Sequence, residues 1–422
     1  MSSANTSPTV EMSDRTIELP SGGVADTARP AGRAGRLVGV DVARGIALLG
    51  MIAVHVFDDF DKGGNPSLTT EVAAGRASTL FVMLAGVGLA LLSGGRRPVQ
   101  GRARTAVAAG LVVRALLIGA IGLLLGELFG EATEVEVILP YYGLLFLLAI
   151  PLIGLRPRTL ALIAAALVAV APVVILWTVA DVGLASLDKG GNLTFGSLFD
   201  DPGGFLAALF ITGPYPVLAF LAYLCVGLAL GRLDLSSGRV AAALLAGGLA
   251  LAVAARVVSS VLLFQLGGMG QLLNTDGEDP VGVATNKLLW DTGRVDSWWY
   301  LAVPAPHSTT PIDLLHTLGS ALAVLGAALL ICRIRVAARL LCPLAAAGAM
   351  TLTLYVGHLL ALATGATDNQ LALYLVLVVV ALAFGYLWRR HLGQGPLEWL
   401  VSSTARLTRR CVAALPSRVA RR

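Results

Sequence analysis

Charge is scarce in this sequence. Only 14% of the 422 residues are charged and 56% are hydrophobic, whereas a soluble domain averages about 25% charged residues. Several apolar runs approach twenty residues, the length at which a helix crosses a bilayer. These two features exclude an ordinary soluble domain and predict a polytopic membrane protein.

Cysteine is rare as well. The four cysteines match no disulfide framework and no metal-ligand spacing. We interpret them as packing residues, and no metal is expected. The net charge of +5 does not indicate nucleic acid, because the basic residues recur in short loops. That pattern sets the orientation of membrane proteins. In contrast, glycine is abundant, with 48 residues, which predicts closely packed helices.

The apolar runs predict an all-α bundle of about ten transmembrane helices. They are expected at 38–57, 77–92, 105–128, 137–153, 160–179, 215–230, 240–266, 312–331, 340–362 and 371–388. Residues 1–34 are expected to form a disordered cytoplasmic tail, 35–388 the transmembrane domain, and 389–422 a basic cytoplasmic tail. Lys and Arg concentrate in both tails and in alternate loops, which predicts cytoplasmic termini and a multi-pass protein of the cell membrane.

Polar residues interrupt the first apolar helix. Arg44 and His55 are eleven positions apart, so they point from one helical face, with backbones ~16 Å apart along the axis. Ionisable groups in membrane helices usually face the bundle interior or a polar cavity. Asp58 and Asp59 follow His55 at i+3 and i+4, so either could orient its ring. A simpler interpretation also stands, in which His55 caps an interface and the carboxylates begin a solvated loop.

The histidines and arginines favour opposite sides of the predicted membrane. His55, His307, His316 and His358 fall toward the outside, and arginine clusters fall toward the inside. Histidine suits proton transfer near neutral pH, and the planar fork of arginine suits phosphate. This distribution favours a protein that takes a phosphate-bearing donor from inside and modifies an acceptor outside.

The first helix also carries a family resemblance. VDVARGIALLGMIAVH resembles the opening of heparan-α-glucosaminide N-acetyltransferase-like membrane proteins, and its Arg-x10-His spacing resembles acyltransferase family 3. The segments GRASTLFVMLAGVGLAL, ILPYYGLLFLLAIP, YPVLAFLAYLCVGLALGRLDL and LTLYVGHLL resemble later parts of the bacterial relatives. The resemblance covers about residues 36–388.

The resemblance implies acyl transfer across the membrane, from cytoplasmic acyl-CoA (acetyl-CoA) to a glycan or lipid-linked acceptor. His55 and Arg44 match the family's first-helix residues, and His358 matches its later histidine. In the lysosomal enzymes an Asn holds the place of His55 and a His follows about ten residues later. Here that later place falls near Asn65, which favours His55 as a general base over an acetyl-histidine.

The remaining predicted site residues are assigned to substrate or donor binding. They are Arg76, Arg114, Tyr141 and Tyr142. Arg44 and Arg114 are expected to stabilise either the donor's phosphates or the developing oxyanion. The expected partners are the bilayer, the acyl donor and the acceptor, with a second copy of the chain as a further candidate. Two alternatives remain open. One is a transporter or flippase for an anionic or lipid-linked solute that uses Arg44, Arg114 and Arg256, and the other is a non-catalytic membrane partner.

Overall fold

Helices dominate the described part of the chain. The computed structural model describes Met1 and residues 37–129, 135–180, 191–273, 281–291, 297–365, 367 and 369–414. These ranges contain helices and turns but no strand, apart from an isolated bridge between Phe60 and Pro66. The chain from Leu37 onward forms one compact unit.

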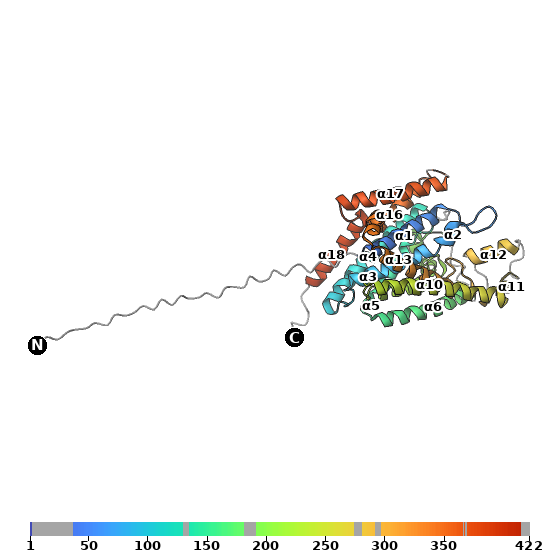
Figure 1. Cartoon of the computed structure of the whole chain (residues 1–422), viewed down its shortest axis with the longest axis horizontal. Helices are drawn as coiled ribbons and strands as arrows, with labels where there is room; N and C mark the ends of the chain where they lie inside the picture. The colour runs from blue at the N-terminus through green and yellow to red at the C-terminus, as the bar shows by residue number, and fades with distance from the viewer. Residues whose placement is uncertain are drawn as a thin grey trace. The chain divides into compact units, whose positions relative to one another are not determined.

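The longest helices of this unit are apolar, and Figure 1 shows their arrangement. Those that could cross a membrane alone are α1 (Val38–Val56), α2 with α3 (Leu68–Val72, Arg76–Leu92), α4 (Gly101–Phe129), α6 (Pro157–Ala180), α10 with the π turn η3 (Gly238–Ser260, Val261–Gln265), α13 (Pro311–Ile331) and α17 (Gln370–His391). The bent pairs are α8 and the π turn η2 with α9 (Pro202–Ala207, Ala208–Thr212, Val217–Leu230), and α15 with α16 (Cys342–Gly348, Thr351–Leu362).

These segments and α5 (Leu139–Leu152) coincide with the ten predicted spans. Within the described residues, seven qualify by length and composition alone, and nine qualify if each bent pair counts as one span. The apolar helix α5 is shorter, at 14 residues. The predicted all-α polytopic bundle is therefore confirmed. The shorter helices are α7 (Phe195–Asp200), α11 (Gly268–Leu273), α12 (Val281–Trp290), the 3₁₀ helix η4 (Trp298–Ala302), α14 (Arg335–Leu340) and α18 (Pro396–Ala414).

Both bends occur where the sequence stops a helix. The 52° bend follows Gly213-Pro214-Tyr215-Pro216, where proline removes backbone donors and clashes with a preceding turn. The 84° bend lies between α15 and α16, where Met350 leaves the helical conformation with φ −128° and ψ 35°. The second bend lets α16 begin as a separate short helix beside α1.

Glycine brings helix backbones together, as the composition predicts. A Cβ on Gly348 of α15 would collide with the carbonyl oxygen of Asp41 in α1. A Cβ on Gly227 of α9 would likewise collide with the carbonyl oxygen of Met83 in α3. Neither crossing could form with a larger residue at the same backbone separation.

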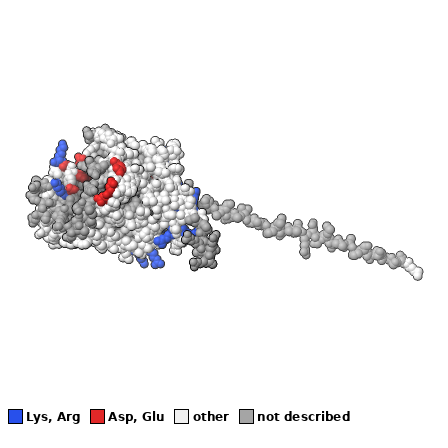
Figure 2. Space-filling model, turned by 180° about the vertical axis from the view of Figure 1, so that it is seen from behind, with Lys and Arg blue, Asp and Glu red and all other residues white. Residues whose placement is uncertain are grey.

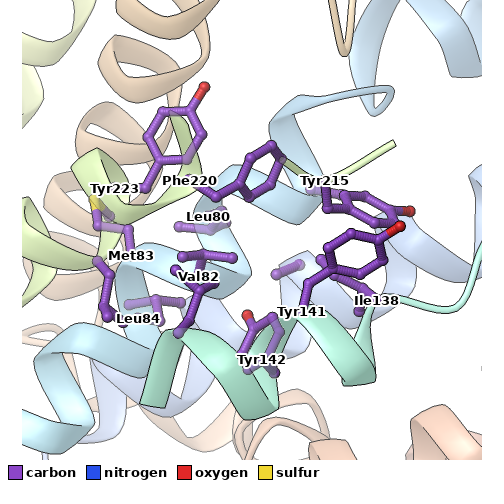
Figure 3. Packing of buried hydrophobic residues seen from close by; sticks show 14 of the residues in the cluster. Leu80, Val82, Met83, Leu84, Ile138, Tyr141, Tyr142, Tyr215, Phe220 and Tyr223 are labelled. Atoms are coloured by element: carbon purple, nitrogen blue, oxygen red, sulfur yellow. The ribbon is translucent and has the colours of Figure 1, made fainter. Parts of the chain in front are cut away.

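Aromatic residues fill the core around α3, α5 and α9. Tyr141 and Tyr142 project from α5 toward α3, and Tyr215 and Phe220 approach from the start of α9 (Figure 3). Their rings meet edge to face, with centroids 5.5 Å apart for Tyr141 and Tyr215 and 5.6 Å apart for Tyr215 and Phe220. This arrangement is typical of aromatic pairs in cores.

Charge is sparse on the surface of the unit. On the face drawn in Figure 2, charged side chains lie toward the two ends, and uncharged surface separates them. An uncharged band of this kind suits the hydrocarbon layer of a bilayer. The structure therefore describes a multi-pass membrane protein.

The connection between residues 267 and 311 and the basic C-terminal segment 389–422 are both partly helical. The connection between 267 and 311 contains α11, α12 and η4, and Leu272, Tyr300 and Val303 form a second buried apolar cluster there. In the predicted basic tail, α18 packs against α4, where a Cβ on Gly110 would meet the side chain of Arg409. This helix belongs to the same compact unit as the membrane helices.

Candidate active site

A pair of histidines joins the first helix to the half-helix α16. Nδ1 of His55 lies 3.0 Å from Nε2 of His358. The rings are stacked, with centroids 5.3 Å apart and an interplanar angle of 7°. His358 is buried at 4% exposure. The structure thus brings together the two residues predicted as catalytic histidines, which are 303 positions apart in the sequence.

The hydrogen bonds of this pair define the tautomers. Nδ1 of His358 lies 3.3 Å from the carbonyl oxygen of Leu354. A carbonyl only accepts, so a neutral His358 carries its proton on Nδ1 and offers a lone pair on Nε2. His55 must then donate from Nδ1, which leaves Nε2 of His55 with its lone pair. An imidazole held in this tautomer is a ready general base.

Contacts made by the first two turns of α16 hold this helix, and with it His358, in place. The Glu398 carboxylate of α18 accepts hydrogen bonds from the backbone N–H groups of Leu352 and Thr353, at 2.7 and 3.0 Å. These donors lack intrahelical partners, and a carboxylate there also offsets the helix dipole. One turn later, Tyr355 contacts both histidine rings edge-on, at 6.2 Å for His55 and 5.1 Å for His358.

A third histidine, His307, lies near His55. The two rings are close enough for their charged forms to repel each other. His307 packs edge-on against Tyr215, with centroids 5.3 Å apart, and interacts with the carbonyl of Pro214. Nδ1 of His307 is buried without a hydrogen-bond partner, so this nitrogen presents a second lone pair. Burial lowers the pKa of His307 to about 4, and the bond to Pro214 partly opposes that shift.

The backbone around His307 is unusual. His307 and Thr309 both have positive φ, at 61° and 56°, a conformation uncommon outside glycine. The flanking residues are buried, including Ala305 at 0% and Ser308 at 3% exposure. Strained backbone in a buried segment is frequent at functional sites. The sequence placed His307 in an outer loop and gave it no role; a buried polar loop with left-handed residues has no periodic signal.

The structure places Asp58 and Asp59, the residues predicted to orient His55, against other partners. Helix α1 ends at Val56, and Phe57 is extended, with φ −100° and ψ 144°. The i+3 and i+4 geometry therefore does not continue to the two carboxylates. Asp58 accepts a hydrogen bond from Gln370 at 2.7 Å, and Asp59 accepts from Thr70 at 3.3 Å. The contact on Nδ1 of His55 is made by His358.

Arg44 and Arg114 lie together, about three helical turns along α1 from His55. Arg44 donates to the carbonyl of Leu84 at 3.3 Å and lies 3.8 Å from the Asp41 carboxylate. Arg114 is close enough to interact electrostatically with Arg44, and also with Arg406 and Arg409 of α18. This group, called the arginine cluster below, has Glu398 and Asp41 as its acidic neighbours. Several guanidinium groups with few acids suit a phosphorylated ligand.

The two predicted tyrosines lie between these features. The Tyr142 hydroxyl is buried without a hydrogen-bond partner and is within electrostatic reach of both Arg44 and Tyr355. Tyr141 packs against Tyr215, as Figure 3 shows, and Tyr215 in turn contacts His307. Tyr142 therefore links the arginine cluster to the histidine pair, whereas Tyr141 supports the packing around His307.

Arg76 does not join the arginine cluster, contrary to its predicted grouping with Arg114. It begins α3, eight residues before Leu84 and so ~12 Å along the axis. It donates to the carbonyl of Ala74 at 3.1 Å and lies 3.0 Å from Nε2 of His316. Nδ1 of His316 faces the carbonyl of Ala252 at 3.1 Å. Both nitrogens of His316 are thus occupied, in contrast to Nε2 of His55.

The described residues contain no group of three His, Cys, Asp or Glu placed to hold a metal ion. What they contain is a helical membrane bundle with a buried base near one end and a cationic cluster farther along the same helix. This combination defines a polytopic membrane protein with ionisable side chains gathered inside its bundle.

Family comparisons agree with this class. The family model described as heparan-alpha-glucosaminide N-acetyltransferase, catalytic, matches residues 36–258. The chain belongs to this family. A second family model, described as protein of unknown function (DUF418), matches residues 280–408. No curated protein matches the chain. His55 lies in the first matched region and His358 in the second, so the histidine pair joins the two. The first-helix similarity to acyltransferase family 3 stays a prediction.

Proposed function

We propose that this protein transfers an acetyl group from acetyl-CoA to a hydroxyl or amine of a glycan or lipid-linked acceptor, with His55 as the general base. The observation that carries the proposal is the lone pair on Nε2 of His55, fixed by the chain of bonds through His358 to Leu354. Membership in a family described as an N-acetyltransferase supports the same reaction class.

The proposed reaction moves one proton from the acceptor to the leaving thiolate by way of His55. Nε2 of His55 takes the proton of the acceptor as its oxygen or nitrogen attacks the acetyl carbonyl. The carbon–sulfur bond of the thioester then breaks, and the CoA thiolate leaves with that proton. His358 accepts the Nδ1–H bond of His55 throughout and stabilises the imidazolium that forms, as the orienting residue of a triad does.

The arginine cluster is the proposed site for the donor's phosphates. Arg44 supplies a guanidinium ~16 Å along α1 from His55, and acyl-CoA carries its phosphates and its thioester at opposite ends. Arg114 has its Nε buried without a partner, which leaves a donor for a ligand oxygen. With the termini in the cytoplasm and the protein in the cell membrane, the cluster meets cytoplasmic donor and His55 meets the acceptor on the far side.

The structure favours transfer over the transport alternative in one respect. A solute site built from Arg44, Arg114 and Arg256 needs the three side chains together. Arg256 instead stacks on Trp290, 4.8 Å from the ring centroid, and its electrostatic neighbours are Asp313 and Glu71. None of these belongs to the arginine cluster.

The test is transfer of radiolabelled acetyl from acetyl-CoA by purified protein in detergent, with a panel of glycan and lipid acceptors. His55→Ala should slow turnover about 10²- to 10⁴-fold, the usual worth of positioned proton transfer, with little change in donor KM. The matched control is His391→Ala, because His391 is exposed at the end of α17; this variant should keep full turnover. A His55→Ala protein that folds and turns over at the normal rate would rule out His55 as the base.

The same assay tests the donor site. Arg44→Ala should raise the KM for acetyl-CoA, and Arg44→Lys should restore only part of the affinity, since lysine keeps the charge and loses the planar fork. Equal KM values in all three proteins would place the donor phosphates elsewhere.

A further inference from the structure

A groove runs along α10 on the side that faces α13. Its volume is about 390 Å³, and residues of α10, η3 and α13 line it. Val253 and Val257 on its wall are 61% and 55% exposed within the unit. Because α10 is one of the membrane-crossing helices, this groove opens toward the lipid.

The groove has one polar wall. Arg256, Ser260 and Gln265 line it together. Arg256 and Ser260 share a face because they are four residues apart. Gln265 comes five residues after Ser260, and the π turn η3 provides the extra residue, with the N–H of Leu266 bonded to the carbonyl of Val261 at 3.0 Å.

Arg256 is the charged group of this wall. In the described ranges, no carboxylate lies within ion-pair distance of its guanidinium, which instead covers the Trp290 ring at 4.8 Å. A second cation, Arg76, does not line the groove but bonds to His316, whose ring does. An arginine near a membrane interface can simply extend toward water. Such an extension accounts for neither the groove nor the two polar side chains beside Arg256.

We propose that this groove binds the phosphate of a membrane lipid. The guanidinium of Arg256 pairs with phosphate oxygens, and the Ser260 hydroxyl and the Gln265 amide supply further donors. Toward the middle of α10, exposed Leu249 and Val253 offer an apolar track for an acyl chain. Arginine and phosphate form charge-assisted, frequently bidentate hydrogen bonds. The site is separate from the histidine pair and does not depend on the proposed acetyl transfer.

Native mass spectrometry of the full chain tests this proposal. The protein is incorporated into phosphatidylcholine nanodiscs containing phosphatidylglycerol, released, and measured for retained lipid. Wild type should retain one phosphatidylglycerol, and Arg256→Gln should weaken that retention about 10- to 150-fold, the range expected for hydrogen bonds to charged groups. The control is Arg239→Gln, which removes an exposed arginine from the other end of α10 and should change nothing.

A second variant distinguishes a bound lipid from a bound free phosphate ion. Val253→Trp fills the apolar part of the groove without a change of charge, and it should also reduce lipid retention. If excess inorganic phosphate displaces the lipid from wild type, and Val253→Trp has no effect, the site binds free phosphate and the proposal is wrong. Equal lipid retention in wild type, Arg256→Gln and Arg239→Gln would show that Arg256 merely extends to the interface.

Discussion

The orienting role of His358 makes a quantitative prediction. Replacement of His358 by Ala removes the acceptor of the Nδ1–H bond of His55, which is 3.0 Å long in the structure. His55 can then take either tautomer, and in one of them Nε2 carries a hydrogen and cannot act as a base. Gln at the same position offers an amide oxygen and can restore the acceptor.

The size of the effect follows from the cost of a buried donor without a partner. That cost is about 1–3 kcal/mol, and each ~1.36 kcal/mol corresponds to a tenfold change in rate. We therefore expect His358→Ala to lower turnover about 5- to 150-fold. This is a smaller loss than for His55→Ala, because His358 acts through His55. His358→Gln should recover most of the rate, and the donor KM should be unchanged in both variants.

The assay is acetyl transfer measured over a range of acetyl-CoA concentrations, so that turnover and KM are separated. Thermal unfolding of each variant shows that the protein is folded. Equal turnover of the Ala and Gln variants would refute the tautomer argument, since only Gln replaces the lost acceptor. A loss for His358→Ala as large as that for His55→Ala would show that His358 contacts substrate itself.

Three further predictions concern stability. Glu398→Ala should lower the free energy of unfolding by about 0.5–2 kcal/mol, the worth of a helix N-terminal cap, measured by denaturant unfolding. Gly348→Ala should disrupt the contact between α1 and α15 and reduce the yield of folded protein on size-exclusion chromatography; Gly357→Ala should not, because its Cβ would meet nothing within 4 Å. The pKa of His307 is lowered to about 4 from an ordinary value of about 6.5, so the unfolded chain alone takes up a proton between these values. This histidine therefore leaves the free energy of unfolding unchanged above pH ~6.5, and the free energy of unfolding decreases as the pH drops from that value toward 4. His307→Asn, which tolerates positive φ, should flatten that part of a pH profile of the unfolding temperature.

The sequence was sufficient for the bundle and for part of the site. Apolar length identifies membrane helices because the bilayer sets a minimum span. Arg44, His55 and Arg114 stand out for a related reason, since an ionisable group in an apolar helix is costly and usually functional. His358 stood out in the same way, although its partner could not be read from its position.

The remainder of the site depends on contacts that spacing does not encode. The pairing of His55 with His358 depends on the 84° bend before α16, and the sequence suggested one continuous span there. Asp58 and Asp59 looked like partners of His55 because helical spacing was extended past the end of α1. His307 was missed because its loop is folded into the protein by long-range packing rather than by local pattern.

The hydrogen bond between Glu398 and the start of α16 has a consequence for biosynthesis. His55 enters the membrane with the first helix, more than 300 positions before His358 and earlier still than Glu398. Until α18 has emerged and bound α16, the half-helix lacks its cap, and His358 is held less firmly against His55. The histidine pair is therefore fully supported only when nearly all of the described chain has been synthesised.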